Sequence, residues 1–168
     1  YNLYITKGLY LDALKIIDSV KLKKLSLIKV DQDRAYILYL INNYQDSILQ
    51  CKKILTADDN NVHALNTLGL CFLKLERYDE ANKVLLKAIS LDNQNIVILN
   101  SLGRLNHELR KSKEAESFFD KAFALSPDSF ETLNNMAGFY LEEEKYQKAI
   151  NFYKKAEKIK PNNSILIN

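Results

Sequence analysis

Two histidines and two cysteines are the side chains of this 168-residue chain best suited to bind a metal ion or attack a substrate. None of them stands in a motif that positions such groups. The chain has no HExxH, GxGxxG, GxxxxGK[ST] or GxSxG sequence, and Cys51 and Cys71 form no CxxC pair. We therefore expect this chain to have no catalytic activity, no metal site and no other cofactor.

The remaining reactive groups have structural interpretations. Glu142, Glu143 and Glu144 form a run of carboxylates, which we interpret as a solvated helix end rather than an acid–base pair. Cys51 and Cys71 are expected to be reduced, buried thiols, although neighbouring segments could bring them together as a disulfide. Reduced thiols are compatible with the cytoplasm, which is the location that we expect.

The charge distribution argues against a nucleic-acid partner. The net charge is +3, and residues 1–27 carry this whole excess in five lysines and two aspartates. The rest of the chain is neutral overall, whereas a nucleic-acid groove needs basic residues along its length. No apolar run approaches the ~18 residues of a transmembrane helix, so we expect no membrane insertion.

Glycine and proline are scarce, with four and two residues. A β-sandwich or β-barrel needs many turns marked by these residues, so an all-β fold is disfavoured. The spacing of the scarce residues is more informative than their number, because a fixed period indicates repeated structural units. A period of 34 residues relates Pro127 to Pro161, Gly69 to Gly103, and Ala81 to Ala115 and Ala149.

Each 34-residue unit is predicted to contain two helices. Within 62–95, apolar residues recur at steps of three and four, a polar stretch interrupts them, and a second helical face follows. Gly69 is expected to face Ala81 where the two helix axes approach, since a larger side chain would push them beyond about 8–10 Å. Pro127 and Pro161 follow second helices, where proline prevents continuation.

This pattern resembles the tetratricopeptide repeat (TPR), whose signature is W-x2-L-G-x2-Y, then A-x3-F, then P. Leu65, Leu68, Gly69, Phe72 and Ala81 carry the resemblance in one unit. It implies an all-α, right-handed α-α superhelix of antiparallel helix pairs. The repeats are predicted at 62–95, 96–129 and 130–163, with a degenerate repeat at 28–61, a partial one at 1–27, and the start of a further truncated repeat at 164–168.

The resemblance also implies that the first helices line a concave groove. The fifth position of successive repeats holds Gln32, Asn66, Asn100 and Asn134, and Asn135 follows at a sixth position. A side-chain amide both donates and accepts, so such a ladder can pair with a peptide backbone. Shared descent of duplicated repeats is the alternative explanation for the amide ladder, and a mixed, solvated face is the alternative for the remaining groove residues. The other predicted groove residues are Tyr36, Tyr39, Leu70, Leu73, Arg104, His107 and Glu131.

We therefore expect a non-catalytic protein–protein interaction scaffold that binds an extended peptide or a partner helix in this groove. The alternative is a substrate-recruiting region of a larger enzyme such as a glycosyltransferase, because residues 133–137 (LNNMA) are similar to repeats of O-GlcNAc transferases. The clamp with which some TPR domains hold chaperone tails is not expected, since its cations are missing. Self-association through Ile165 and Ile167, where the chain ends within a repeat, is a third hypothesis.

Overall fold

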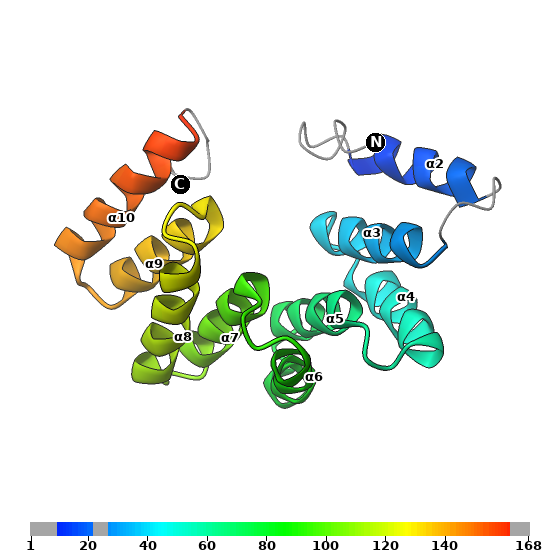
Figure 1. Ribbon diagram of the computed structural model, residues 1–168, viewed down its shortest axis with the longest axis horizontal. Helices are drawn as coiled ribbons and strands as arrows, with labels where there is room; N and C mark the ends of the chain where they lie inside the picture. The colour runs from blue at the N-terminus through cyan, green and yellow to red at the C-terminus, as the bar shows by residue number, and fades with distance from the viewer. Residues whose placement is uncertain (1–9, 22–26, 162–168) are drawn as a thin grey trace. The chain divides into compact units, whose positions relative to one another are not determined.

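The computed structural model describes residues 10–21 and 27–161, and every regular element in these ranges is an α-helix (Figure 1). The first part of the predicted partial repeat, residues 1–9, and the predicted start of a further repeat at 164–168, including Ile165 and Ile167, lie outside the described residues. The helices are α2 (Tyr10–Lys21), α3 (Leu27–Leu40), α4 (Tyr44–Ala57), α5 (Val62–Lys74), α6 (Tyr78–Leu91), α7 (Ile96–Glu108), α8 (Ser112–Leu125), α9 (Phe130–Glu142) and α10 (Tyr146–Ile159).

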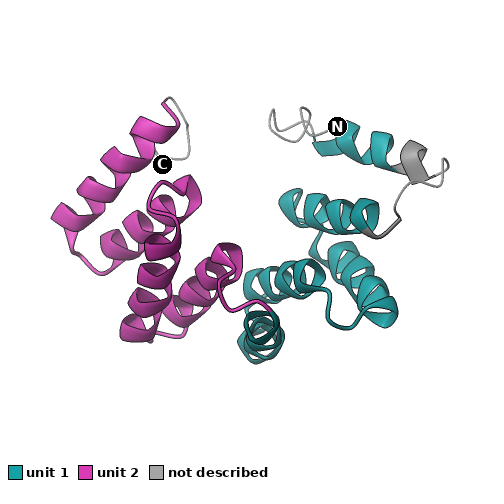
Figure 2. Ribbon diagram, in the orientation of Figure 1, with its two compact units in different colours: residues 1–91 teal, residues 92–168 magenta. Residues whose placement is uncertain are grey.

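Two compact units divide the chain (Figure 2). Unit 1 covers residues 1–91 and contains α2 to α6, and unit 2 covers residues 92–168 and contains α7 to α10. Consecutive helices pack in pairs, α3 with α4 and α5 with α6 in unit 1, and α7 with α8 and α9 with α10 in unit 2. First helices of successive pairs also contact each other, α3 with α5 and α7 with α9.

Polar caps determine where the first helix of a pair begins. Asn61 Oδ1 accepts a hydrogen bond of 3.1 Å from the backbone N–H of Ala64, and Ser129 Oγ accepts one of 3.3 Å from Thr132. Asn95 caps α7 in the same way. The three capping residues are 34 residues apart, so local turn chemistry follows the same period as the core.

A left-handed residue closes the turn inside each of the four pairs from α3 to α10. After α5, Arg77 N donates to Phe72 O at 2.9 Å and Glu76 N donates to Leu73 O at 3.1 Å. These two bonds form a Schellman motif, which satisfies carbonyls at the end of the helix. The left-handed residues are Asn42, Glu76, Arg110 and Glu144, with φ of 62°, 58°, 59° and 58°.

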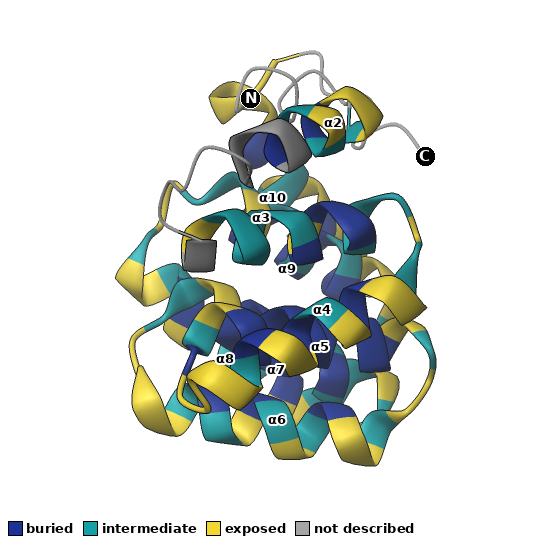
Figure 3. Ribbon diagram, turned by 90° about the vertical axis from the view of Figure 1, so that its right-hand side faces the viewer, coloured by how far each residue is buried: buried dark blue, intermediate teal, exposed yellow. Residues whose placement is uncertain are grey.

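The two helices of a pair approach closely because one position carries no side chain. A Cβ built on Gly69 would lie 2.6 Å from the Leu85 side chain, and one on Gly103 would lie 2.5 Å from the Phe119 ring. The atoms nearest to Gly69 belong to Leu85, one helical turn further along α6 than Ala81, the residue predicted to face it. The side chains at these contacts, Leu85 and Phe119, are buried, whereas the outer side of α6 is exposed (Figure 3).

Two alanine substitutions should have opposite effects on stability. Gly103→Ala should lower the free energy of unfolding by about 2 kcal/mol, because its Cβ collides with Phe119. Gly138→Ala should raise it by about 1 kcal/mol, because nothing lies within 4 Å of that Cβ and alanine favours the helix. Urea unfolding followed by circular dichroism measures both, and shifts of equal sign would contradict the packing described here.

Glycine at a left-handed turn position should also stabilise the fold. Glu144→Gly removes the steric cost of a positive φ, partly offset by the greater freedom of glycine in the unfolded chain, for a net gain of about 0.5 kcal/mol. The control is Glu157→Gly inside α10, which should lower stability by about 1 kcal/mol. The midpoint of urea unfolding reports both changes, and a loss of stability in Glu144→Gly would rule out strain at this turn.

Candidate functional site

A groove of about 320 Å³ lies between α7 and α9 in unit 2. Four residues predicted from the sequence line it, together with acidic side chains at its rim and aromatic rings deeper down. The structure therefore gathers this part of the predicted site around a single hollow. The lining residues are Arg104, His107 and Glu108 from α7, Phe119 from α8, Asn134, Asn135, Gly138, Phe139 and Glu142 from α9, and Tyr153 from α10.

One turn of α9 supplies both an unused donor and open space. The Nδ2 atom of Asn135 is buried and has no hydrogen-bond acceptor among the residues that the structure describes. Gly138 follows three residues later, and a Cβ there would meet nothing within 4 Å. Residues three apart share a helix face, so a ligand entering beside Gly138 comes close to the Asn135 amide.

The charged groups of the groove are unevenly paired. His107 Nε2 lies 3.7 Å from Glu142 Oε2, and the His107 ring packs edge-on against Phe139 at 5.2 Å between centroids. Arg104 forms no hydrogen bond or ion pair with any described residue. Glu131, which was also predicted for the groove, is not one of its lining residues; burial raises its pKa, whereas the positive charges of Arg104 and Lys160 act to lower it.

The predicted amide ladder separates into two kinds of residue. Asn100 is 1 % exposed, and its Nδ2 donates to Thr132 Oγ1 at 2.9 Å, which links α7 to α9. Asn66 is also buried, at 7 % exposure. Asn134 and Asn135 are only partly buried and line the groove. In unit 2, Asn100 therefore connects neighbouring helix pairs, and Asn134 and Asn135 remain candidates for ligand contact.

The predicted residues of unit 1 are placed differently. The Nε2 of Gln32 donates to Asn61 Oδ1 at 2.8 Å, so this amide already serves the start of α5. Tyr36 is 43 % exposed and stacks on Tyr39 at 5.9 Å, as an aromatic patch requires. The predicted apolar patch is wrong, because Leu70 and Leu73 are each only 6 % exposed and are part of the core.

Two buried polar groups of unit 1 escaped sequence reasoning. The Oδ2 atom of Asp33 and the Nε2 atom of Gln50 are buried and make no hydrogen bond among the described residues. Burial raises the pKa of Asp33, and the nearby His63 opposes that shift. The position of a residue within the repeat does not predict this burial, because the packing of neighbouring helices determines which polar atoms are shielded from solvent.

The cysteines are free and buried. Cys71 Sγ donates to Ser47 Oγ at 3.1 Å, and Ser47 Oγ donates to the backbone oxygen of Ala35 at 2.7 Å. Burial raises the pKa of Cys51 to about 12, so its reactive thiolate form is scarce at neutral pH. Cys71 therefore links helices of the core through Ser47, and burial disfavours the thiolate form of both cysteines.

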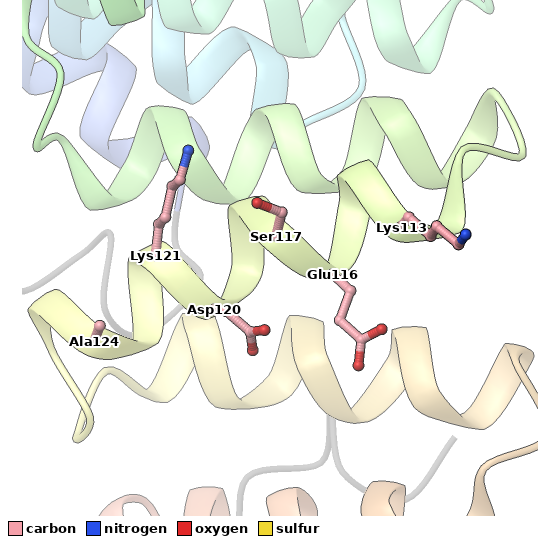
Figure 4. Close-up of a pocket in the computed structure, with 6 residues that line it drawn as sticks. All are labelled: Lys113, Glu116, Ser117, Asp120, Lys121 and Ala124. Atoms are coloured by element: carbon pink, nitrogen blue, oxygen red, sulfur yellow. The ribbon is translucent and has the colours of Figure 1, made fainter.

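Another hollow is lined, among the described residues, by a single helix. It measures about 560 Å³, and all six of its lining residues belong to α8 (Figure 4). Glu116 and Asp120 point to one side of α8, whereas Lys121 points to the other (Figure 4). Side chains that diverge in this way cannot converge on one ligand. Across the described ranges, no three His, Cys, Asp or Glu side chains gather into a metal site, and no helix is long and apolar enough to span a membrane.

Comparison with known proteins identifies the repeat. The family model described as tetratricopeptide repeat matches residues 130–163, and that described as anaphase-promoting complex, cyclosome, subunit 3 matches residues 40–122. The crystal structure of TTC0263, a thermophilic TPR protein of Thermus thermophilus, has a TM-score of 0.89 and 19 % identity to this chain, covering 99 % of this chain and 90 % of that one. The chain is a tetratricopeptide repeat protein.

This TPR protein is similar in fold to further solved structures. YrrB is 21 % identical with a TM-score of 0.62, covering 99 % of this chain and 86 % of its own. MamA is 26 % identical with a TM-score of 0.60, covering 77 % and 74 %. No curated protein matches the sequence. The predicted all-α TPR fold class is confirmed, and the similarity of residues 133–137 to O-GlcNAc transferase repeats stays a prediction.

A polar cluster joins three helices of the TPR unit 2. Tyr140 Oη donates to Glu116 Oε1 at 2.8 Å, and Lys148 Nζ lies 3.6 Å from the same oxygen. The Tyr140 hydrogen bond, followed by the charges of Lys145 and Lys148, lowers the pKa of Glu116 in spite of its partial burial. The pKa of Asp120 is raised by its own burial and by the charge of Glu116.

Replacing Glu116 should produce a pH-dependent loss of stability. A carboxylate with a lowered pKa stabilises the fold above its unfolded pKa, and this contribution is lost as the pH falls through the folded pKa. Glu116→Gln should therefore cost about 1 kcal/mol at pH 7, and the cost should shrink as the pH falls below 4.5 and through the lowered folded pKa of Glu116. Urea unfolding across pH measures this, with Glu114→Gln as the exposed control on α8. A cost that does not change with pH would exclude a charge effect.

Proposed function

We propose that this TPR protein is a non-catalytic interaction scaffold whose α7–α9 groove binds an extended peptide segment of a partner protein. The observation that carries the proposal is the pairing of the unused Asn135 donor with the open space beside Gly138. A buried donor without an acceptor is costly, and a bound peptide carbonyl would satisfy it.

The lining residues suit a peptide backbone better than a strongly charged ligand. Asn134 and Asn135 can donate to carbonyl groups and accept from N–H groups, as an extended chain requires. A ligand side chain beside Gly138 would enter the hollow that the rings of Phe139 and Tyr153 also line. Polar groups that bind the backbone and rings that bind a side chain are the two contributions that hold an extended peptide.

The charges of the groove favour a protein partner over a nucleic acid. Arg104 and His107 share the groove with Glu108 and Glu142. A phosphate backbone would meet these carboxylates as well as the cations, and its affinity depends on unopposed basic residues. YrrB, which shares the fold, is described as a TPR protein with an unusual peptide-binding site, and this supports a peptide as the ligand class.

Filling the groove at Gly138 tests the proposal. Gly138→Leu should fold, since the space is open, and should weaken peptide binding at least about tenfold by occupying the ligand's place. The probe is a surface-displayed library of random nine-residue peptides, from which the unaltered protein selects binders. Affinities of the selected peptides are then measured by fluorescence anisotropy.

A matched control separates groove filling from added hydrophobicity. Ser117→Leu adds the same side chain on the exposed part of α8, away from the groove, and should leave affinity unchanged. Asn135→Ala should weaken the same peptides, because it removes the donor while leaving the space open. Failure to select any peptide, or binding that survives Gly138→Leu, would count against the groove as the binding site.

A further inference from the structure

A second surface of unit 2 runs along α10, the orange-to-red helix of Figure 1. Two hollows meet there at Lys155, one of about 310 Å³ and one of about 250 Å³. Tyr140, Lys148 and Phe152 line the larger hollow, and Phe123 and Leu133 line the smaller. Lys155 lines both hollows, which together are called the α10 furrow and share no lining residue with the α7–α9 groove.

Aromatic rings form much of the apolar lining of the furrow. Tyr140 and Phe152 stack with their centroids 5.5 Å apart and an interplanar angle of 14°. Phe123 meets Phe152 edge-on at 5.7 Å. These rings come from three helices, so the packing of α8, α9 and α10 holds them in place. Tyr140 is buried beneath Phe152, whereas Phe123 and Phe152 are partly exposed and offer apolar contact area to a ligand beside Lys155.

Lys155 is a cation without a carboxylate partner. Its Nζ lies 5.2 Å from the centroid of Phe123 and 5.4 Å from that of Phe152. It makes no hydrogen bond or ion pair with the part of the chain that the structure describes. Lys148 differs, since its Nζ lies 3.6 Å from Glu116. Lys155 therefore places an unpaired positive charge at the junction of the two hollows, and Lys158, which also has no carboxylate partner among the described residues, adds a second at the smaller hollow.

The surrounding charges limit what this cation can bind. Lys158 and Asp128 line the smaller hollow, and Glu116 and Asp120 project from the neighbouring α8. A polyanion with closely spaced phosphates would meet these three carboxylates, so it is a poor match. A single ligand carboxylate at Lys155 avoids them.

We propose that the α10 furrow is a second docking site, for an extended acidic peptide segment whose glutamate or aspartate binds Lys155. Apolar side chains two residues before and after the acid occupy the two hollows, because alternate residues of an extended chain face the same side. The rings beneath Lys155 exclude water from one side of the cation, which strengthens its attraction to the ligand carboxylate.

The test uses three nine-residue peptide pools with leucine at the fourth and eighth positions and glutamate, glutamine or lysine at the sixth. The other positions are random. Fluorescence anisotropy measures binding to the full chain and to its Lys155→Glu and Lys154→Glu variants, with a single-stranded oligothymidylate as a further probe. Lys154 is also exposed on α10 but lines neither hollow, so its variant has the same charge change at the wrong place.

The unaltered chain should prefer the glutamate pool to the glutamine pool by about fivefold. Lys155→Glu should remove this preference and gain affinity for the lysine pool, whereas Lys154→Glu and the groove variant Gly138→Leu should change neither. The proposal would be overturned if the two lysine variants had equal effects or if the unaltered chain did not discriminate between the pools. It would also be overturned if the oligothymidylate bound more tightly than the peptides and through Lys155. Loss of binding in Gly138→Leu would place these peptides in the α7–α9 groove instead.

Discussion

The close approach of two helices at a position without a side chain is the constraint on which each pair depends. At Gly103 the Phe119 ring occupies the place where a Cβ would stand, and Ala115 on the same face of α8 is fully buried. The left-handed turn at Arg110 directs α8 back along α7 so that these residues meet. A pair closed in this way leaves its first helix available to contact the first helix of the next pair within the unit.

A shift of one residue converts this closed contact into an open one. Ala137 stands 34 residues after Gly103 and is fully buried, as its place at the crossing requires. Gly138 comes next, and one residue turns about 100° around a helix, so it faces away from the crossing and into the groove. The same residue type thus permits close packing at Gly103 and leaves space for a ligand at Gly138.

The asparagines and lysines show how one residue type acquires several roles in a repeat. Asn61 begins a helix, Asn100 bonds to a neighbouring helix, and Asn135 retains a donor with no acceptor among the described residues. Among the lysines, Lys148 lies beside Glu116, whereas Lys155 lies over two rings. Duplicated units place these residues at related positions, and the contacts around each one then determine its chemistry.

The amino-acid sequence by itself determined the fold class, the 34-residue period and the two-helix unit. Glycine, alanine and proline at fixed spacing act locally, through steric limits that any neighbouring helix must respect. The sequence also predicted that Asn134, Asn135, Arg104 and His107 share one surface, because the period and helix geometry place them on the same face. All four line the α7–α9 groove. Tertiary structure alone decided that Leu70 and Asn100 are buried. Their solvent exposure depends on helices distant in sequence, and no local pattern contains that information.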